Sequence, residues 1–107
     1  MSEAKTESEA YADDTPLLEL FGDSARTRIL AAAVGNRDRE LNVSELARQA
    51  GIARPTVYDH LDDLVEIGAL EPRGKRYTLA NSDLGELLYK TEGTALRYLL
   101  EAEGKLD

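Results

Sequence analysis

Apolar positions recur along this chain with helical spacing, in segments separated by glycines and charged loops. A first helix is predicted from Ser24 to Val34, where apolar side chains lie four residues apart and Ser24 supplies the amino-terminal cap. An apolar piece at residues 17–21 precedes it. Residues 1–14 are mainly acidic, small and polar, with too little apolar surface to offset the entropy of ordering. We therefore expect them to form a disordered acidic arm.

Two more helices are predicted in the middle of the chain, joined by a tight turn. After a short strand at residues 41–43, Ser44 is expected to cap a two-turn helix that Gly51 ends. The next helix, residues 54–67, has a proline in its first turn, where a missing N–H costs nothing, and an apolar stripe along one face. The pattern therefore indicates helix, turn, helix.

The last third of the chain contains a predicted hairpin and a long amphipathic helix. Two short strands flank the basic turn Arg73-Gly74-Lys75-Arg76. Residues 82–104 follow, with apolar or small side chains at spacings of three and four. Such a face favours pairing with a second copy, and the alternative is that the helix folds back on its own domain. The residues expected at a dimer interface are Leu84, Leu88, Thr91, Ala95, Tyr98 and Leu99.

The most informative stretch is G-I-A-R-P-T-V-Y-D-H-L-D-D-L-V-E-I-G, residues 51–68, between the short capped helix and the basic hairpin. In this order the residues resemble the winged helix-turn-helix of bacterial and archaeal regulators of the ArsR and MarR type. The resemblance covers roughly residues 23–79. It implies a mainly helical α+β fold, with a winged helix-turn-helix DNA-binding domain over residues 15–81 and a dimerisation helix over residues 82–104. Sensor members of the ArsR family carry a cysteine-containing metal motif in the second helix, and this chain has no thiol there.

The resemblance makes the helix after the turn a recognition helix, whose first turns enter the major groove of double-stranded DNA. At about 100° per residue, the side chains on or beside its outward face are Arg54, Pro55, Thr56, Tyr58, Asp59 and His60. Arg54 suits guanine, Thr56 a thymine methyl or a phosphate, and Asp59 the amino group of cytosine. Tyr58 and His60 suit phosphates or base edges. The alternatives are that Tyr58 packs under the wing and that His60 bonds to its own domain.

Two further elements are expected to contact the DNA backbone. Ser44 lies at a helix start, where backbone N–H groups can bind a phosphate, and a plain helix cap is the equally good alternative. Arg73, Lys75 and Arg76 make the densest positive charge in the chain, next to a glycine that permits a tight turn. They suit a wing that grips the DNA backbone or minor groove, and a solvated turn is the alternative.

The net charge supports this hypothesis only when its distribution is considered. The 107 residues include 21 acids and 13 bases, a net of −8, which by itself argues against a nucleic-acid partner. Residues 1–23 carry −6 and residues 77–107 carry −3, whereas residues 24–76 carry +1. The acidity and the preference for arginine over lysine resemble cytoplasmic proteins of salt-loving archaea, where salt screens charge strongly. An ordinary acidic protein is the alternative.

Acidic side chains also lie on the predicted recognition helix itself. Asp59 and Asp63, like Asp62 and Glu66, are like charges four residues apart on its exposed side, where a DNA phosphate repels them. They favour the second hypothesis that we consider, a winged-helix protein–protein interaction module with an acidic face and no specific DNA binding. Loss of Arg54 and of the wing charges tests the first hypothesis, and loss of the acids tests the second.

Composition limits the remaining possibilities. With no cysteine and one histidine, the chain offers no disulfide, no thiolate metal site and no evident catalytic group, so we expect no enzyme, no metal and no cofactor. No apolar run approaches the roughly 18 residues that span a bilayer, and we expect a cytoplasmic protein without membrane contact. No segment stands out as a small-molecule effector or activation domain. We therefore predict a homodimeric repressor that reads a palindromic operator.

Overall fold

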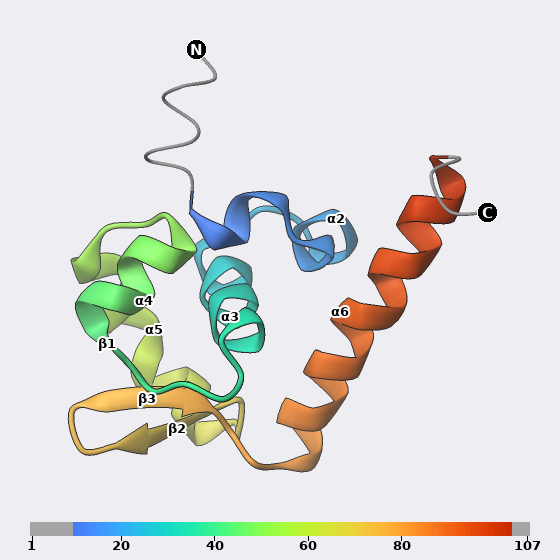
Figure 1. Ribbon diagram of the computed structural model, residues 1–107. Coiled ribbons are helices and arrows are strands. Elements are labelled where there is room, and N and C mark those ends of the chain that lie inside the picture. Colours follow the sequence, from blue (N-terminus) through green and yellow to red (C-terminus); the bar gives the residue numbers. More distant parts are fainter. Residues whose placement is uncertain (1–9, 104–107) are drawn as a thin grey trace.

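The computed structural model describes residues 10–103 (Figure 1). Its helices are η1 (Tyr11–Asp14, a 3₁₀ helix), α2 (Pro16–Phe21), α3 (Ala25–Gly35), α4 (Val43–Ala50), α5 (Arg54–Glu66) and α6 (Asp83–Ala102). Its strands are β1 (Leu41–Asn42), β2 (Leu70–Arg73) and β3 (Arg76–Leu79), paired antiparallel in the order β1-β3-β2. The predicted fold class is confirmed: a winged helix-turn-helix is followed by a long carboxyl-terminal helix.

The core lies where α3, α4, α5 and the small sheet meet. Residues 31–33 of α3 are buried alanines, whose small side chains allow neighbouring helices to pack closely. Burial of each large apolar side chain contributes about 1.5–3 kcal/mol. The large side chains that are most completely buried are Leu17, Ile29, Leu41, Leu46, Val57, Leu64 and Leu70. They come from α2, α3, α4, α5, β1 and β2, and none comes from α6.

The start of α4 differs from the prediction. Its cap is Asn42 rather than Ser44, because Asn42 Oδ1 accepts a hydrogen bond from the Glu45 N–H while Glu45 Oε1 accepts one from the Asn42 N–H, both at 2.8 Å. Because of this reciprocal capping box the helix begins at Val43, and the strand before it ends at Asn42, one residue earlier than predicted. Ser44 lies exposed in the first turn. The predicted Ser24 cap of α3 is confirmed, with its Oγ accepting from Thr27.

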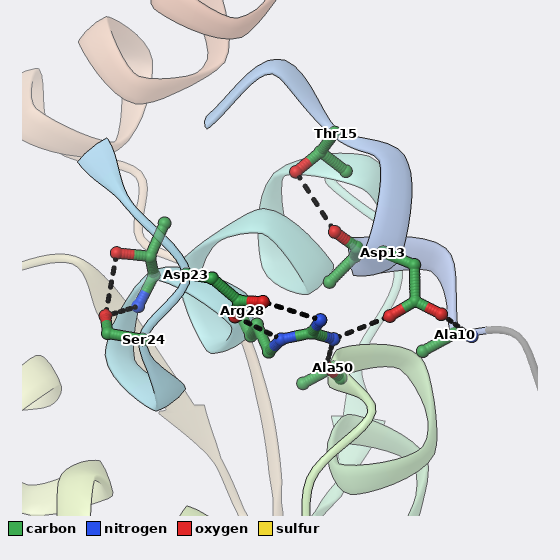
Figure 2. Close-up of polar contacts among 9 residues, drawn as sticks. Ala10, Asp13, Thr15, Asp23, Ser24, Arg28 and Ala50 are labelled. Atoms are coloured by element: carbon green, nitrogen blue, oxygen red, sulfur yellow. Dashed lines mark hydrogen bonds and ion pairs between the residues drawn. The ribbon is translucent and has the colours of Figure 1, made fainter. Parts of the chain in front are cut away.

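The predicted disordered arm is wrong at its carboxyl end. Residues 1–9 lie outside the described residues, but η1 is ordered against α3 and α4, and Ala12 is fully buried. Figure 2 shows the contact responsible: Arg28 of α3 donates to Asp13 Oδ1 at 2.7 Å, to the Ala50 carbonyl at 2.9 Å and to both carboxylate oxygens of Asp23. One guanidinium thus joins η1, the loop before α3 and the end of α4.

Helix α6 packs only partly on its own domain. It leaves the sheet after β3 and runs beside α2, while the β2–β3 turn points the other way (Figure 1). Only Gly85 and Ala95 of this helix are buried, and Leu88 packs partly against the core. The alternative that the helix folds back is therefore correct for one side of it. Within residues 10–103, no helix is both long and apolar enough to cross a membrane.

Candidate nucleic-acid interface

The turn between α4 and α5 is held tightly against the amino-terminal part of the chain. The N–H groups of Gly51 and Ile52 both donate to the Ala47 carbonyl, at 2.8 and 3.1 Å. Gly51 has φ +76°, and a Cβ there would stand 2.8 Å from Arg28 Nη1 and 2.9 Å from the Ala10 Cβ. Glycine therefore satisfies both the left-handed backbone and the close packing. This turn fixes where α5 begins.

Helix α5 has one face in the core and another in solvent. Val57, Leu61 and Leu64 are buried, which sets the rotation of the helix about its axis. Ala53 precedes the helix without a side-chain cap, Pro55 has no N–H, and the Thr56 N–H donates to the Ala53 carbonyl at 3.0 Å. A shallow hollow at this end is lined by four of the predicted readers, Arg54, Pro55, Tyr58 and Asp59. Thr56 lies half-buried beside them.

Tyr58 and His60 lie in different surroundings, although both flank the outward face. Tyr58 is 57% exposed, so it does not pack under the wing. The His60 ring instead lies against α3, where Arg26 Nη2 is 3.3 Å from its Nδ1. An arginine can only donate, so Nδ1 accepts in this contact. The structure therefore places His60 in a bond to its own domain, which is the alternative considered from the sequence, and apart from the other predicted readers.

The acidic residues of α5 are not equivalent. Arg26 Nη2 also lies 3.1 Å from Asp63 Oδ2, so the charge of this acid is balanced within the protein. Asp62 and Glu66 are exposed, beyond the first turns of the helix. Among the described residues, Asp59 is the only acid that lines the hollow at the amino-terminal end of the helix. The repulsion expected between this helix and a phosphate is therefore concentrated away from the end predicted to enter the groove.

The wing is a hairpin with a two-residue turn and a third strand beside it. Arg73 pairs with Arg76 across the turn, and Gly74 has φ +65°. Arg73 forms an ion pair with Glu71 at 2.9 Å, and Arg76 lies 3.7 Å from a Glu45 oxygen. Within the described part of the chain, Lys75 has no acidic partner. The tip is thus exposed and cationic, but two of its three bases are shared with carboxylates.

Glu71 connects the wing to the start of α6. Its Oε1 accepts from the Asn81 N–H at 3.2 Å, and its Oε2 accepts from Arg73. The backbone hydrogen bond from Asn81 lowers the pKa of this carboxyl, and the charge of Arg73 lowers it further. Glu71 therefore stays ionised at neutral pH and holds Arg73 near the strand.

The structure brings most of the predicted DNA-contacting residues to exposed positions on three elements. These are the first turns of α5, the hairpin tip and the first turn of α4, with the half-buried Thr56 and His60 as the exceptions. The dimer residues are divided: Ala95 is buried and Leu88 faces the core, whereas Tyr98 is 64% exposed. The Arg26 contacts were missed, although an arginine in the first turn of a helix opposes the helix dipole and so signals a partner elsewhere.

Comparison with known proteins agrees with this geometry. A family model described as a helix-turn-helix domain matches residues 21–73. The match runs from the end of α2 to the first wing base and includes α3, α4 and α5. No curated protein and no solved structure matches the chain. The match supports a place among helix-turn-helix regulators, whose partner is DNA.

Proposed function

We propose that this helix-turn-helix protein is a sequence-specific transcriptional regulator that binds double-stranded DNA as a homodimer. The observation that carries the proposal is the surface formed by Arg54, Pro55, Tyr58 and Asp59, which the protein's own fold does not cover. In this proposal Arg54 would donate a bidentate pair to guanine, and Asp59 would accept from cytosine. Thr56 beside them suits a thymine methyl. The first turns of α5 would lie in the major groove.

The wing and α4 supply the phosphate contacts in this proposal. Arg73, Lys75 and Arg76 would bind the backbone or the minor groove, and the first turn of α4 at Ser44 would meet a neighbouring phosphate. The ion pairs of Arg73 and Arg76 are exposed, and such pairs contribute only about 0–1 kcal/mol. Exchanging a carboxylate partner for a phosphate therefore costs little.

A second copy is the proposed partner of the exposed apolar side of α6. We define the dimer patch as Leu20, Phe21, Leu87 and Tyr98, each at least half exposed. Leu20, Leu87 and Tyr98 also line a groove of about 460 Å³ whose floor includes Thr91 and Ala95. Protruding side chains and a hollow lie side by side, as a self-complementary twofold contact requires. Leu99 also lines this groove, and Leu84, which does not line it, is proposed as a further contact of the interface.

A dimer of this kind would read a palindrome, with one half-site for each recognition helix. Bound at a promoter, it would exclude the transcription machinery and so act as a repressor. The acidic composition further suggests a protein adapted to high intracellular salt, as in salt-loving archaea. Sequence-dependent binding that persists at molar KCl would support this adaptation, and loss of binding well below that concentration would contradict it.

Binding to the protein's own upstream DNA across a KCl series tests the proposal. Wild type should prefer this DNA over a scrambled duplex of the same composition. Arg54→Ala should cost about 1–3 kcal/mol and relax the preference, because it removes a base contact. Replacing the three wing bases with glutamine should weaken binding to all duplexes. The slope of the logarithm of the binding constant against the logarithm of the KCl concentration should become shallower by up to about 0.9 per lost phosphate contact. A folded protein that binds neither this DNA nor pooled genomic DNA at any salt would refute it.

The protein–protein module is the second candidate, because Asp62 and Glu66 form an exposed acidic pair that no base of the described chain neutralises in an ion pair. The double variant Asp62→Asn and Glu66→Gln separates the two functions. A DNA regulator should bind DNA equally well or more tightly after this change. A module that uses its acidic face should instead lose a basic protein partner, while its DNA binding stays absent throughout.

A further inference from the structure

Hydrogen bonds of Ser82 hold the connection between the wing and α6 against the rest of the domain. The Ser82 hydroxyl donates to the Gly68 carbonyl at 2.7 Å and accepts from the Gly85 N–H at 3.0 Å. Gly68 directly follows the last residue of the α5 cap, and Gly85 lies in the first turn of α6. One hydroxyl therefore links the end of the proposed recognition helix to the beginning of the proposed dimer helix.

Gly85 lets the two segments approach more closely than any other residue would allow. It is buried, and a Cβ at this position would stand 2.1 Å from the carbonyl oxygen of Ala80. That oxygen belongs to the backbone, and the Ala80 N–H is itself bonded to the Ala69 carbonyl at 2.9 Å. The clash has no flexible side chain to relieve it. A side chain at position 85 would have to move α6.

A second tether holds the same end of α6 from the loop after α3. Arg37 Nη2 donates to Glu86 Oε1 at 2.5 Å, and its guanidinium lies 4.0 Å from the centre of the Tyr89 ring. The Arg37 carbonyl also accepts from the Thr78 hydroxyl on β3. Contacts from two sides thus fix the direction in which α6 leaves the domain.

We propose that Ser82 and Gly85 are positioning residues that set the separation of the two recognition helices, and thereby the half-site spacing that the protein accepts. This inference rests on the proposed function, in which α5 reads DNA and α6 pairs the protomers. A helix of 20 residues is about 30 Å long, so a rotation of about 10° at this connection displaces its far end by about 5 Å. That exceeds the rise of one base pair, about 3.4 Å.

The first test measures the separation without DNA. Because the chain has no cysteine, Asp62→Cys on the exposed side of α5 accepts a single spin label per protomer. The distance between labels in the dimer should be narrowly distributed. Gly85→Ala should shift or broaden it by at least about one base-pair rise, roughly 3 Å. Gly93→Ala is the matched control, because a Cβ there meets nothing within 4 Å, and it should leave the distance unchanged.

Two serine variants keep the test decisive if Gly85→Ala does not fold. Ser82→Ala removes the hydroxyl link without adding a clash and should broaden the distance distribution. Ser82→Thr keeps the hydroxyl and should restore the wild-type distribution. A merely structural role would lower the melting temperature of Ser82→Ala while leaving the distance in the folded dimer unchanged, and that result would overturn the inference.

The second test measures spacing on DNA. Palindromes are built from the half-site that wild type selects from a random duplex pool, with the centre lengthened or shortened by single base pairs. Wild type and Gly93→Ala should bind the palindrome of one spacing at least ten times more tightly than the others. Gly85→Ala should move that optimum or lose the tenfold preference. Dimers that bind DNA with an unchanged profile overturn this inference alone, whereas a chain that is monomeric or binds no DNA overturns the proposed function with it.

Discussion

Helices α5 and α6 are both amphipathic, but the domain covers the apolar face of α5 and only part of that of α6. Helix α5 places Val57, Leu61 and Leu64 in the core and keeps mainly polar side chains outside. The longer α6 buries only a glycine and an alanine, and leaves Leu87 and Tyr98 more than half exposed. Apolar surface of that kind on a folded protein indicates a partner. The outward face of α5 suits a charged partner, and that of α6 an apolar one.

The largest expected effect contrasts one leucine from each helix. Leu64→Ala should lower the free energy of unfolding by about 2–5 kcal/mol, because it leaves a cavity in a close-packed core. Leu87→Ala should change the stability of the monomer by less than about 0.5 kcal/mol, because its side chain is largely in water. Urea denaturation at low protein concentration measures both. Equal losses would contradict the distinction between the two helices.

A smaller loss is expected where Arg28 holds the turn before α5. Arg28→Met removes the donor that serves Asp13, Asp23 and the Ala50 carbonyl, and should destabilise the protein by about 1–3 kcal/mol. Amide hydrogen exchange should accelerate at Gly51 and Ile52. Arg39→Met is the control, because among residues 10–103 its exposed side chain bonds only to the nearby Asn36, and it should have little effect. Unchanged exchange at the turn would show that Arg28 does not hold it.

Dimerisation of the protein tests the role of the exposed apolar side of α6. The double variant Leu87→Ser and Tyr98→Ser should weaken dimerisation at least tenfold, about 1.4 kcal/mol, because it removes apolar area from the dimer patch. Sedimentation velocity across a concentration series measures it. Leu96→Ser changes an exposed leucine outside this patch and should leave association intact. A stronger effect at Leu96 would place the interface on the other flank of α6.

The smallest expected effect concerns pH. The hydrogen bond from Arg28 lowers the pKa of Asp23 in the folded protein, so this carboxylate stabilises the fold above its unfolded pKa. The contribution disappears as the pH falls through the lowered value. The melting temperature of wild type should therefore drop more steeply than that of Asp23→Asn between pH 5 and about pH 3. In the Arg28→Gln background the two curves should coincide, and a persistent difference would assign the effect to another group.

The helices and the wing could be predicted because their signals are local. Ser24 marks a helix start by its hydroxyl, Gly51 and Gly68 mark helix ends by their left-handed backbone, and the apolar stripe of residues 54–67 defines the buried face of α5. The cap of α4 was predicted two residues late, although Asn42 and Glu45 have the spacing of a capping box. Residues 10–14 were assigned to a disordered arm because their acidity gives no sign of Arg28, which is distant in sequence.

The parts of the candidate site that depend on spacing within one helix could be predicted, and the parts that depend on contacts between helices could not. Helical spacing placed Arg54, Tyr58 and Asp59 on the outward face. The position of His60 depends on Arg26 of another helix, which spacing within α5 does not reveal. The division of the α6 stripe likewise depends on how α2 and α3 lie against it, so Ala95 looked as available to a partner as Tyr98.

The contacts of Arg28 with Asp13, Asp23 and the Ala50 carbonyl determine where the cooperatively folded part of the chain begins. The recognisable helix-turn-helix domain starts at residue 21, yet Asp13 and the buried Ala12 lie before that point. The first residue that the family model matches is therefore not the first residue of the packed domain. A fragment that starts at residue 21 would retain every residue that the family model matches, yet it would lose Asp13, one of the groups that hold Arg28 beside the turn before α5.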